Sequence, residues 1–94
     1  GDDGMTYAQP RPGHLQVRPV DAKSLRPLFA RPHYVRRVAA NGNVLWHTEA
    51  YSNRRNAVRA AEVHAERDGL WVHVYGLHGR ILRMVEPTRW DRDR

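Results

Sequence analysis

The sequence predicts an α+β domain of ββαββ order, in which a four-stranded antiparallel sheet carries one helix on one face. Three observations predict this fold. Residues 33–50 form two apolar runs around an Asn-Gly pair, and residues 52–67 repeat small apolar residues at helical spacing. Residues 70–85 form two further strand-like runs around a turn that contains glycine. The predicted domain therefore spans residues 33–87.

The first 32 residues are predicted to form a proline-rich arm that precedes the domain. Five of the six prolines lie in this stretch, and proline fixes φ and removes a backbone donor, which disfavours helices and central strands. The sequence allows a short extended piece at residues 14–18 and a helical turn at residues 22–29. Phe29 is expected to be buried against the sheet. Residues 1–4 precede the first methionine and are interpreted as an expression remnant.

The first hairpin is predicted at residues 33–50. Asn41 and Gly42 separate two runs rich in β-branched and aromatic residues. Asn-Gly is the strongest short signal for a hairpin, because both residues tolerate a positive φ in the turn. We expect the strands at residues 33–40 and 44–50.

A helix is predicted to follow this hairpin. Ser52 offers its hydroxyl as an N-cap, and Gly69 suits the left-handed backbone that ends many helices. Small residues such as Ala57 and Ala61 recur on one face, so the helix is expected to lie close on the sheet. The expected core consists of Trp46, Tyr51, Ala57, Ala61, Val72 and Val74.

The second hairpin is predicted over residues 70–85. Its first strand alternates Leu70, Val72 and Val74 with a row of rings, and a Gly-Leu-His-Gly turn leads into the return strand. Pro87 ends that strand. The charged segment at residues 88–94 is expected to be a frayed tail.

Two stretches resemble known bacterial families. Residues 40–42 (Ala-Asn-Gly) and 48–52 (Thr-Glu-Ala-Tyr-Ser), with the helix that follows, resemble the YegP-like small domains of unknown function. The chain departs from that family at Ala50, where glycine is usual, and at residues 53–54, where a Ser-Lys pair is common. Residues 57–81 are similar to a second uncharacterised family with an Ala-rich helix and a Gly-Arg-Ile return strand. These resemblances imply the fold, and neither family supplies a catalytic residue.

Composition favours an anionic partner. The formal net charge is +6, the pI is about 10.7, and all basic residues except Lys23 are arginine. A GC-rich genome is the other explanation of the arginine bias. The chain has no cysteine, which excludes disulfides and thiolate chemistry and fits a cytoplasmic location. No apolar run approaches the roughly 20 residues of a membrane helix, and no signal peptide is recognised.

No motif predicts an enzyme, a cofactor or a metal site. The six histidines are scattered, without a His-x-x-x-His pair on the helix. His73 and His78 flank a turn and could approach each other. His47 and Glu49 share a strand face and could form an acid–base pair, although a surface strand explains them more simply. We therefore expect a protein that binds rather than catalyses.

The sequence favours nucleic-acid binding, because a sheet that exposes arginine beside rings can contact phosphates and stack bases. The strand–strand–helix run also resembles sheet-type DNA readers such as the arm-binding domains of phage integrases. The alternative is a protein-interaction module, such as a small regulator or phage-type accessory factor. The residues expected to contact DNA or RNA are Arg36, Arg37, Arg54, Arg55, Arg59, Arg80 and Arg83.

A homodimer is expected because the predicted domain is small and has neither disulfide nor metal to stabilise it. The row of Trp71, His73 and Tyr75 and the open edges of the sheet are the surfaces that a second copy would cover. The arm, through Leu25 and Leu28, is the competing cover within one chain.

Overall fold

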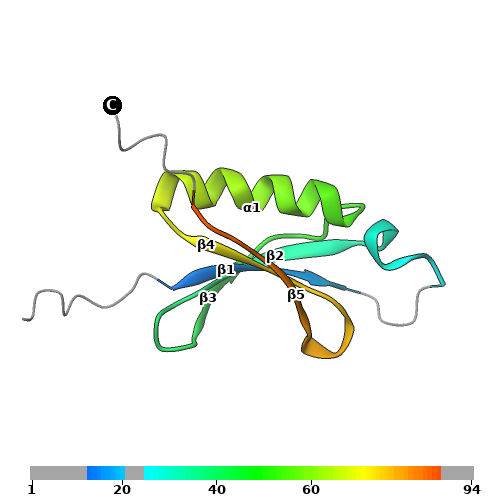
Figure 1. The fold of residues 1–94 in the computed structure, drawn as a ribbon, viewed down its shortest axis with the longest axis horizontal. Coiled ribbons are helices and arrows are strands. Elements are labelled where there is room, and N and C mark those ends of the chain that lie inside the picture. Colours follow the sequence, from blue (N-terminus) through cyan, green and yellow to red (C-terminus); the bar gives the residue numbers. More distant parts are fainter. Residues whose placement is uncertain (1–12, 21–24, 88–94) are drawn as a thin grey trace, which may run out of the picture.

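The structure, a computed structural model, describes residues 13–20 and 25–87 of the 94-residue chain. These residues form one sheet, one α-helix and two short 3-10 helices (Figure 1). In chain order the elements are β1 (His14–Pro19), η2 (Leu28–Ala30), β2 (His33–Val38), β3 (Val44–His47), α1 (Arg54–Asp68), β4 (Trp71–Tyr75), η3 (Leu77–Gly79) and β5 (Ile81–Val85).

The sheet has five strands in the order β3-β2-β1-β4-β5. The hairpins β2–β3 and β4–β5 are antiparallel, as expected, and β1 lies between them, antiparallel to β2 and parallel to β4. The α+β class with a single helix is confirmed. The expectation of four antiparallel strands is wrong, because residues 14–19 form a central fifth strand and make the sheet mixed. The boundary expected at residue 33 therefore lies inside the sheet.

β1 is central because its side chains are buried on both faces. Leu15 and Val17 are fully buried, and Gln16 between them is 7% exposed. The strand contains only one proline, Pro19, which is its last residue, a position where the missing backbone donor is tolerated. The prolines that flank this run in the sequence therefore do not prevent residues 14–17 from pairing on both sides.

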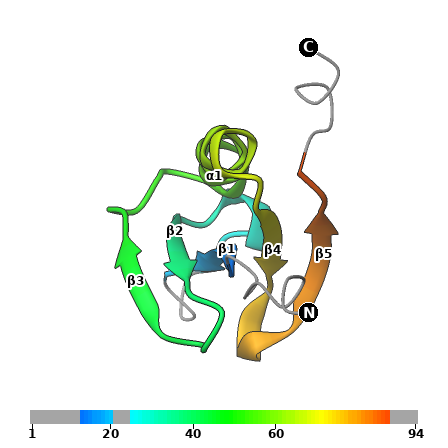
Figure 2. The same ribbon diagram turned by 90° about the vertical axis from the view of Figure 1, so that its left-hand side faces the viewer.

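The helix covers one face of the sheet. In the end-on view of Figure 2 the sheet curves around α1, so that the helix lies on the concave side and none of the described helices lies on the convex side. The core between these layers contains Leu15, Val17, Val35, Ala57, Val58, Ala61, Ala65, Leu70, Val72 and Val74. Of the six expected core residues, four are buried, whereas Trp46 and Tyr51 are half-buried and pack at its margin.

The helix ends are close to the expected positions. The N-cap is Asn53 rather than Ser52, because the Asn53 Oδ1 accepts a hydrogen bond of 2.9 Å from the Asn56 backbone N–H. Gly69 ends the helix with a φ of 68°, as predicted. Among the residues that the structure describes, no helix is long and apolar enough to cross a membrane.

The segment between β1 and β2 differs from the expectation. Residues 28–30 form the 3-10 helix η2, and Phe29 on it is 58% exposed rather than buried. Part of the helical turn expected at residues 22–29 lies outside the described residues, as do the remnant at residues 1–4, most of the arm before β1, and the tail at residues 88–94.

The central position of β1 predicts that Leu15→Ala destabilises the fold by about 2–5 kcal/mol, the usual cost of a cavity at a fully buried leucine. Leu25 is the matched control because it is fully exposed, and Leu25→Ala should change the free energy of unfolding by no more than about 0.5 kcal/mol. Urea denaturation of the three proteins measures both values. Equal stabilities of the two variants would show that β1 is not a core strand.

Candidate nucleic-acid interface

The convex face of the sheet, which we call the open sheet face, carries one row of side chains across all five strands. Gln16 on β1 lies opposite Arg36 on β2 and His73 on β4. Arg36 in turn lies opposite His47 on β3, and His73 lies opposite Met84 on β5. These residues face away from α1, because they alternate along each strand with the residues that pack against the helix. The row is polar at its centre.

Gln16 fixes the two arginines of this face. Its Oε1 accepts hydrogen bonds from Arg18 Nη1 at 3.0 Å and from Arg36 Nε at 2.9 Å. Its Nε2 lies 3.0 Å from His14 Nε2 and 3.3 Å from the Tyr75 hydroxyl. Because arginine only donates, the amide oxygen must face the two guanidinium groups. The Gln16 side chain is buried, and its hydrogen bonds hold the guanidinium groups of Arg18 and Arg36 at a defined spacing on the open sheet face.

Aromatic rings lie on the same sheet face as the two arginines. The His14 and His73 rings stack with centroids 4.1 Å apart and an angle of 20° between their planes. The Arg18 guanidinium lies 4.3 Å from the centre of the Tyr75 ring, in cation–π geometry. The Trp71 side chain, beside His14 in the register of β1 and β4, is 40% exposed. The open sheet face therefore combines flat rings with positive charge.

The strands carry no negative charge. None of the residues in β1 to β5 is Asp or Glu. The carboxylates of the described residues lie instead on the helix and in the segments that follow β3 and β5: Glu49, Glu62, Glu66, Asp68 and Glu86. This separation leaves the arginines of the sheet without carboxylate neighbours on their own strands.

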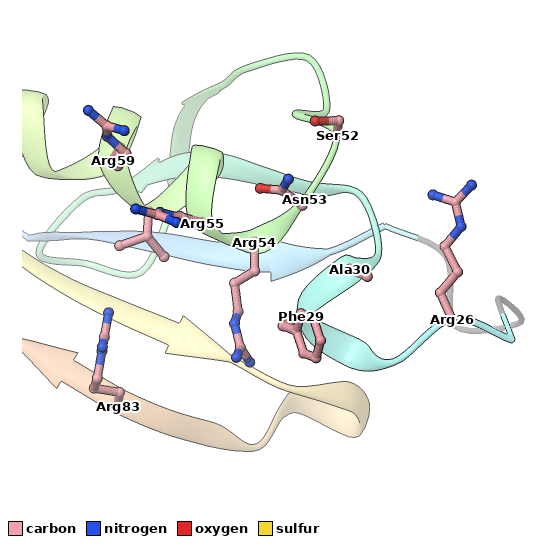
Figure 3. Close-up of a pocket in the computed structure, with 10 residues that line it drawn as sticks. Arg26, Phe29, Ala30, Ser52, Asn53, Arg54, Arg55, Arg59 and Arg83 are labelled. Carbon is pink, nitrogen blue, oxygen red and sulfur yellow. The ribbon is translucent and has the colours of Figure 1, made fainter.

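A second basic surface lies on the helix side of the sheet. It is a hollow of about 640 Å³ between η2, the first turns of α1 and β5, and we call it the arginine pocket (Figure 3). Figure 3 shows Arg83 extending from β5 towards the helix and Arg54 descending from the helix beside Phe29. No carboxylate lines the pocket. Its arginines are Arg26, Arg54, Arg55, Arg59 and Arg83.

Most of these guanidinium groups have no counter-charge. Within residues 13–20 and 25–87, Arg54, Arg55, Arg59 and Arg83 form no ion pair. The first turn of α1 also has no acidic residue, although acidic residues are the ones that stabilise a helix at this end. Like charges in one hollow repel each other, so a bound anion would lower the electrostatic energy of the pocket. Guanidinium groups match phosphate oxygens in charge and geometry.

The structure divides the arginines expected from the sequence into three groups. Arg36 lies on the open sheet face, and Arg54, Arg55, Arg59 and Arg83 line the arginine pocket. Arg37 and Arg80 join neither surface. Arg37 is half-buried on the helix side of β2, opposite Trp46, and Arg80 lies in the exposed turn before β5.

Sequence reasoning missed Gln16, Arg18 and Arg26. Gln16 and Arg18 belong to the stretch that proline content assigned to the arm. The available signal was the alternation of His14, Gln16 and Arg18 with two apolar residues, which is the pattern of a strand with one polar face.

The histidines do not gather into a metal site in the part of the chain that the structure describes, where no group of three or more His, Asp or Glu could hold an ion. His73 stacks on His14 instead of approaching His78. His47 Nδ1 contacts the Thr48 carbonyl oxygen at 3.2 Å. Comparisons of the chain with protein-family models, curated proteins and solved structures find no match, so the resemblance to YegP-like domains stays a prediction.

The surroundings of three histidines lower their pKa below the ordinary value. Burial lowers the pKa of His14, and the neighbouring His73 and Arg36 lower it further. Burial also lowers the pKa of His73. For His33, which is fully buried, burial lowers the pKa more than the hydrogen bond of its Nδ1 to the Arg31 carbonyl raises it.

These shifts predict that the fold loses stability as the pH falls below the ordinary histidine value of about 6.5. Above that pH both states are neutral; below it the unfolded chain binds protons that the folded chain resists, so the free energy of unfolding falls. Urea midpoints at pH 7.5 and 5.5 measure the loss. His73→Phe, which keeps a ring on His14, should reduce the loss. An equal or higher midpoint at pH 5.5 in the wild type would contradict this account.

Proposed function

We propose that the protein binds nucleic acid, largely without regard to sequence, through phosphate contacts in the arginine pocket and on the open sheet face. The observation that carries the proposal is the arginine pocket, in which Arg54, Arg55, Arg59 and Arg83 surround one hollow without an ion pair among the described residues. Contacts to phosphate position a protein on nucleic acid and carry no sequence information directly, which supports weak discrimination between sequences.

The open sheet face also supports the proposal of phosphate binding. Arg18 and Arg36 are held side by side by Gln16, and their strands contain no carboxylate that would compete with a phosphate. A folded protein that places two separate groups of arginine away from its acidic residues concentrates positive potential where a polyanion can approach.

The proposal predicts a steep dependence of affinity on salt, because each neutralised phosphate releases condensed counterions. Fluorescence polarisation with a labelled oligonucleotide across a salt series measures the slope. Arg55→Ala and Arg83→Ala should each weaken binding to all sequences and lower the magnitude of the slope by about 1. No binding to DNA or RNA at low salt would remove the proposal.

Arg67→Ala is the matched control for these variants. Arg67 lies at the opposite end of α1 from Arg55, where it contacts His64 and Asp68, and its removal lowers the net charge by the same amount. Alanine preserves the helix at both positions. If Arg67→Ala weakened binding as much as Arg55→Ala, the effect would come from net charge and not from the pocket.

A protein partner is the second candidate, and the edge strand β5 favours it. This strand ends the sheet and exposes Ile81, Leu82 and Met84, and an open edge can pair with a strand of another chain. The homodimer expected from the sequence would cover the open edges of the sheet, including this one, and the row of Trp71, His73 and Tyr75. Binding of this kind depends on apolar area and backbone pairing, so its affinity would change little with salt. A cytoplasmic location stays a proposal that fits both candidates.

A further inference from the structure

We infer that the nucleic acid is single-stranded, and that the open sheet face receives one of its unpaired bases on Trp71. This inference rests on the proposed function and names the class of nucleic acid. Three features carry it: the position of the two basic surfaces, the shape of a hollow beside Trp71, and the charge of the face around that hollow.

The two basic surfaces lie on opposite faces of one sheet. Arg83 lines the arginine pocket, and the next residue, Met84, points to the open sheet face beside His73. The arginine pocket and the open sheet face therefore meet at the edge strand β5, where consecutive residues belong to one surface and the other. A single strand is flexible enough to pass over this edge, whereas a duplex is stiff over about 150 base pairs and would contact one face at a time.

A hollow of about 600 Å³ opens on the open sheet face at the start of β1 and β4. Its ring-bearing side is formed by His14, Trp71 and His73, with Met84 beside them. The other side consists of small residues from the chain before β1 and from the β2–β3 turn, Gly13, Ala39, Ala40 and Gly42. A gap with rings on one side and almost no side chain on the other admits a flat group.

On the side of the hollow that consists of small residues, the backbone requires glycine at position 13. Gly13 has a φ of 91°, and a Cβ atom on it would lie 2.0 Å from the Val38 carbonyl oxygen. A larger residue at this position would therefore displace the end of β2. Both segments contribute small residues to the hollow that Trp71 also lines, and the exposed indole of Trp71 offers a surface for stacking.

A nucleobase fits the chemistry of this hollow. Bases stack on aromatic side chains regardless of sequence, since every base has a π face. Arg18 and Arg36 lie further along the same face, where the phosphates that flank a stacked base can reach them. In a duplex the bases are stacked on each other and unavailable to Trp71, so the hollow favours an unpaired strand.

A second copy of the chain is a poorer occupant of this face. Face-to-face pairing would bring Arg18 and Arg36 of one protomer onto a face that carries the same two arginines in its partner, and the strands of that face supply no carboxylate to pair with them. Like charges opposed in this way cost association energy. The charge of the face is complementary to a polyanion and not to itself.

The test compares three labelled probes of equal length at one low salt concentration: a single strand, its duplex, and a strand of abasic residues that keeps the phosphates and lacks bases. The wild type should bind the single strand roughly 5- to 150-fold more tightly than the abasic strand, the range expected for stacking of a base on an aromatic side chain. The duplex should also bind more weakly than the single strand.

Two substitutions separate the ring from the charge. Trp71→Leu should lower affinity for the single strand towards the abasic level, whereas Trp71→Phe, which keeps an aromatic face, should retain most of it. Arg55→Ala should weaken binding of all three probes by a similar factor. Thermal melting of each variant checks that it is folded, and the comparison of probes on the wild type needs no variant at all.

The outcomes distinguish this inference from the proposed function. Equal affinity for the three probes, with no effect of Trp71→Leu, would overturn the single-strand inference and leave phosphate binding intact. Tighter binding of the duplex would overturn it as well. Failure of the wild type to bind any probe at low salt would overturn the proposed function and the inference together.

Discussion

The alternation of side chains on β1 determines both the core under α1 and the arrangement of the open sheet face. Leu15 and Val17 face α1 and are fully buried in the core. Gln16, between them, faces the other way and holds Arg18 and Arg36 by its amide oxygen. Because side chains on a strand alternate between faces, the residues that anchor the helix and the residue that organises the exposed face are fixed in one register. A shift of that register by one residue would bury the amide under the helix and expose the leucine.

The same strand joins the two hairpins into one sheet. The two hairpins are not neighbours in the sheet, because β1 lies between β2 and β4 and pairs with both of these strands. The sheet that results curves around α1 and leaves its convex face uncovered by any described helix (Figure 2). Among the described residues, acidic side chains are confined to the helix and the segments after β3 and β5, so the charged side chains of the strands on the convex face and of the pocket where α1 begins are arginines. Fold and charge distribution therefore arise from one arrangement of the strands.

Local patterns in the sequence predicted the helix and the two hairpins. They did not predict the pairing of β1 with strands that lie far from it in the sequence. Asn41-Gly42 marks the first hairpin and Gly69 the end of the helix, because each requires a backbone conformation that few residues adopt. β1 gave only a weak signal: its parallel neighbour β4 is far away in the sequence, and the surrounding prolines favoured an arm. Arg54, Arg55 and Arg59 line one pocket because one helix carries them, whereas Arg18 was overlooked with its strand, and Arg37, which was expected at the surface, is half-buried. Exposure of Phe29 depends on how η2 meets α1, which no local pattern records.

The most direct test of a nucleic-acid interface on these two surfaces is a map of backbone amide chemical shifts as a single-stranded oligonucleotide is added to isotope-labelled protein. We expect the largest changes at Gln16, Arg36 and His73 on the open sheet face and at residues 54–59 of α1, in the arginine pocket. Residues 62–68, at the acidic end of the helix, should change little. Changes concentrated at that acidic end, or no saturable change anywhere, would contradict the proposal that this basic protein binds nucleic acid through its open sheet face and arginine pocket.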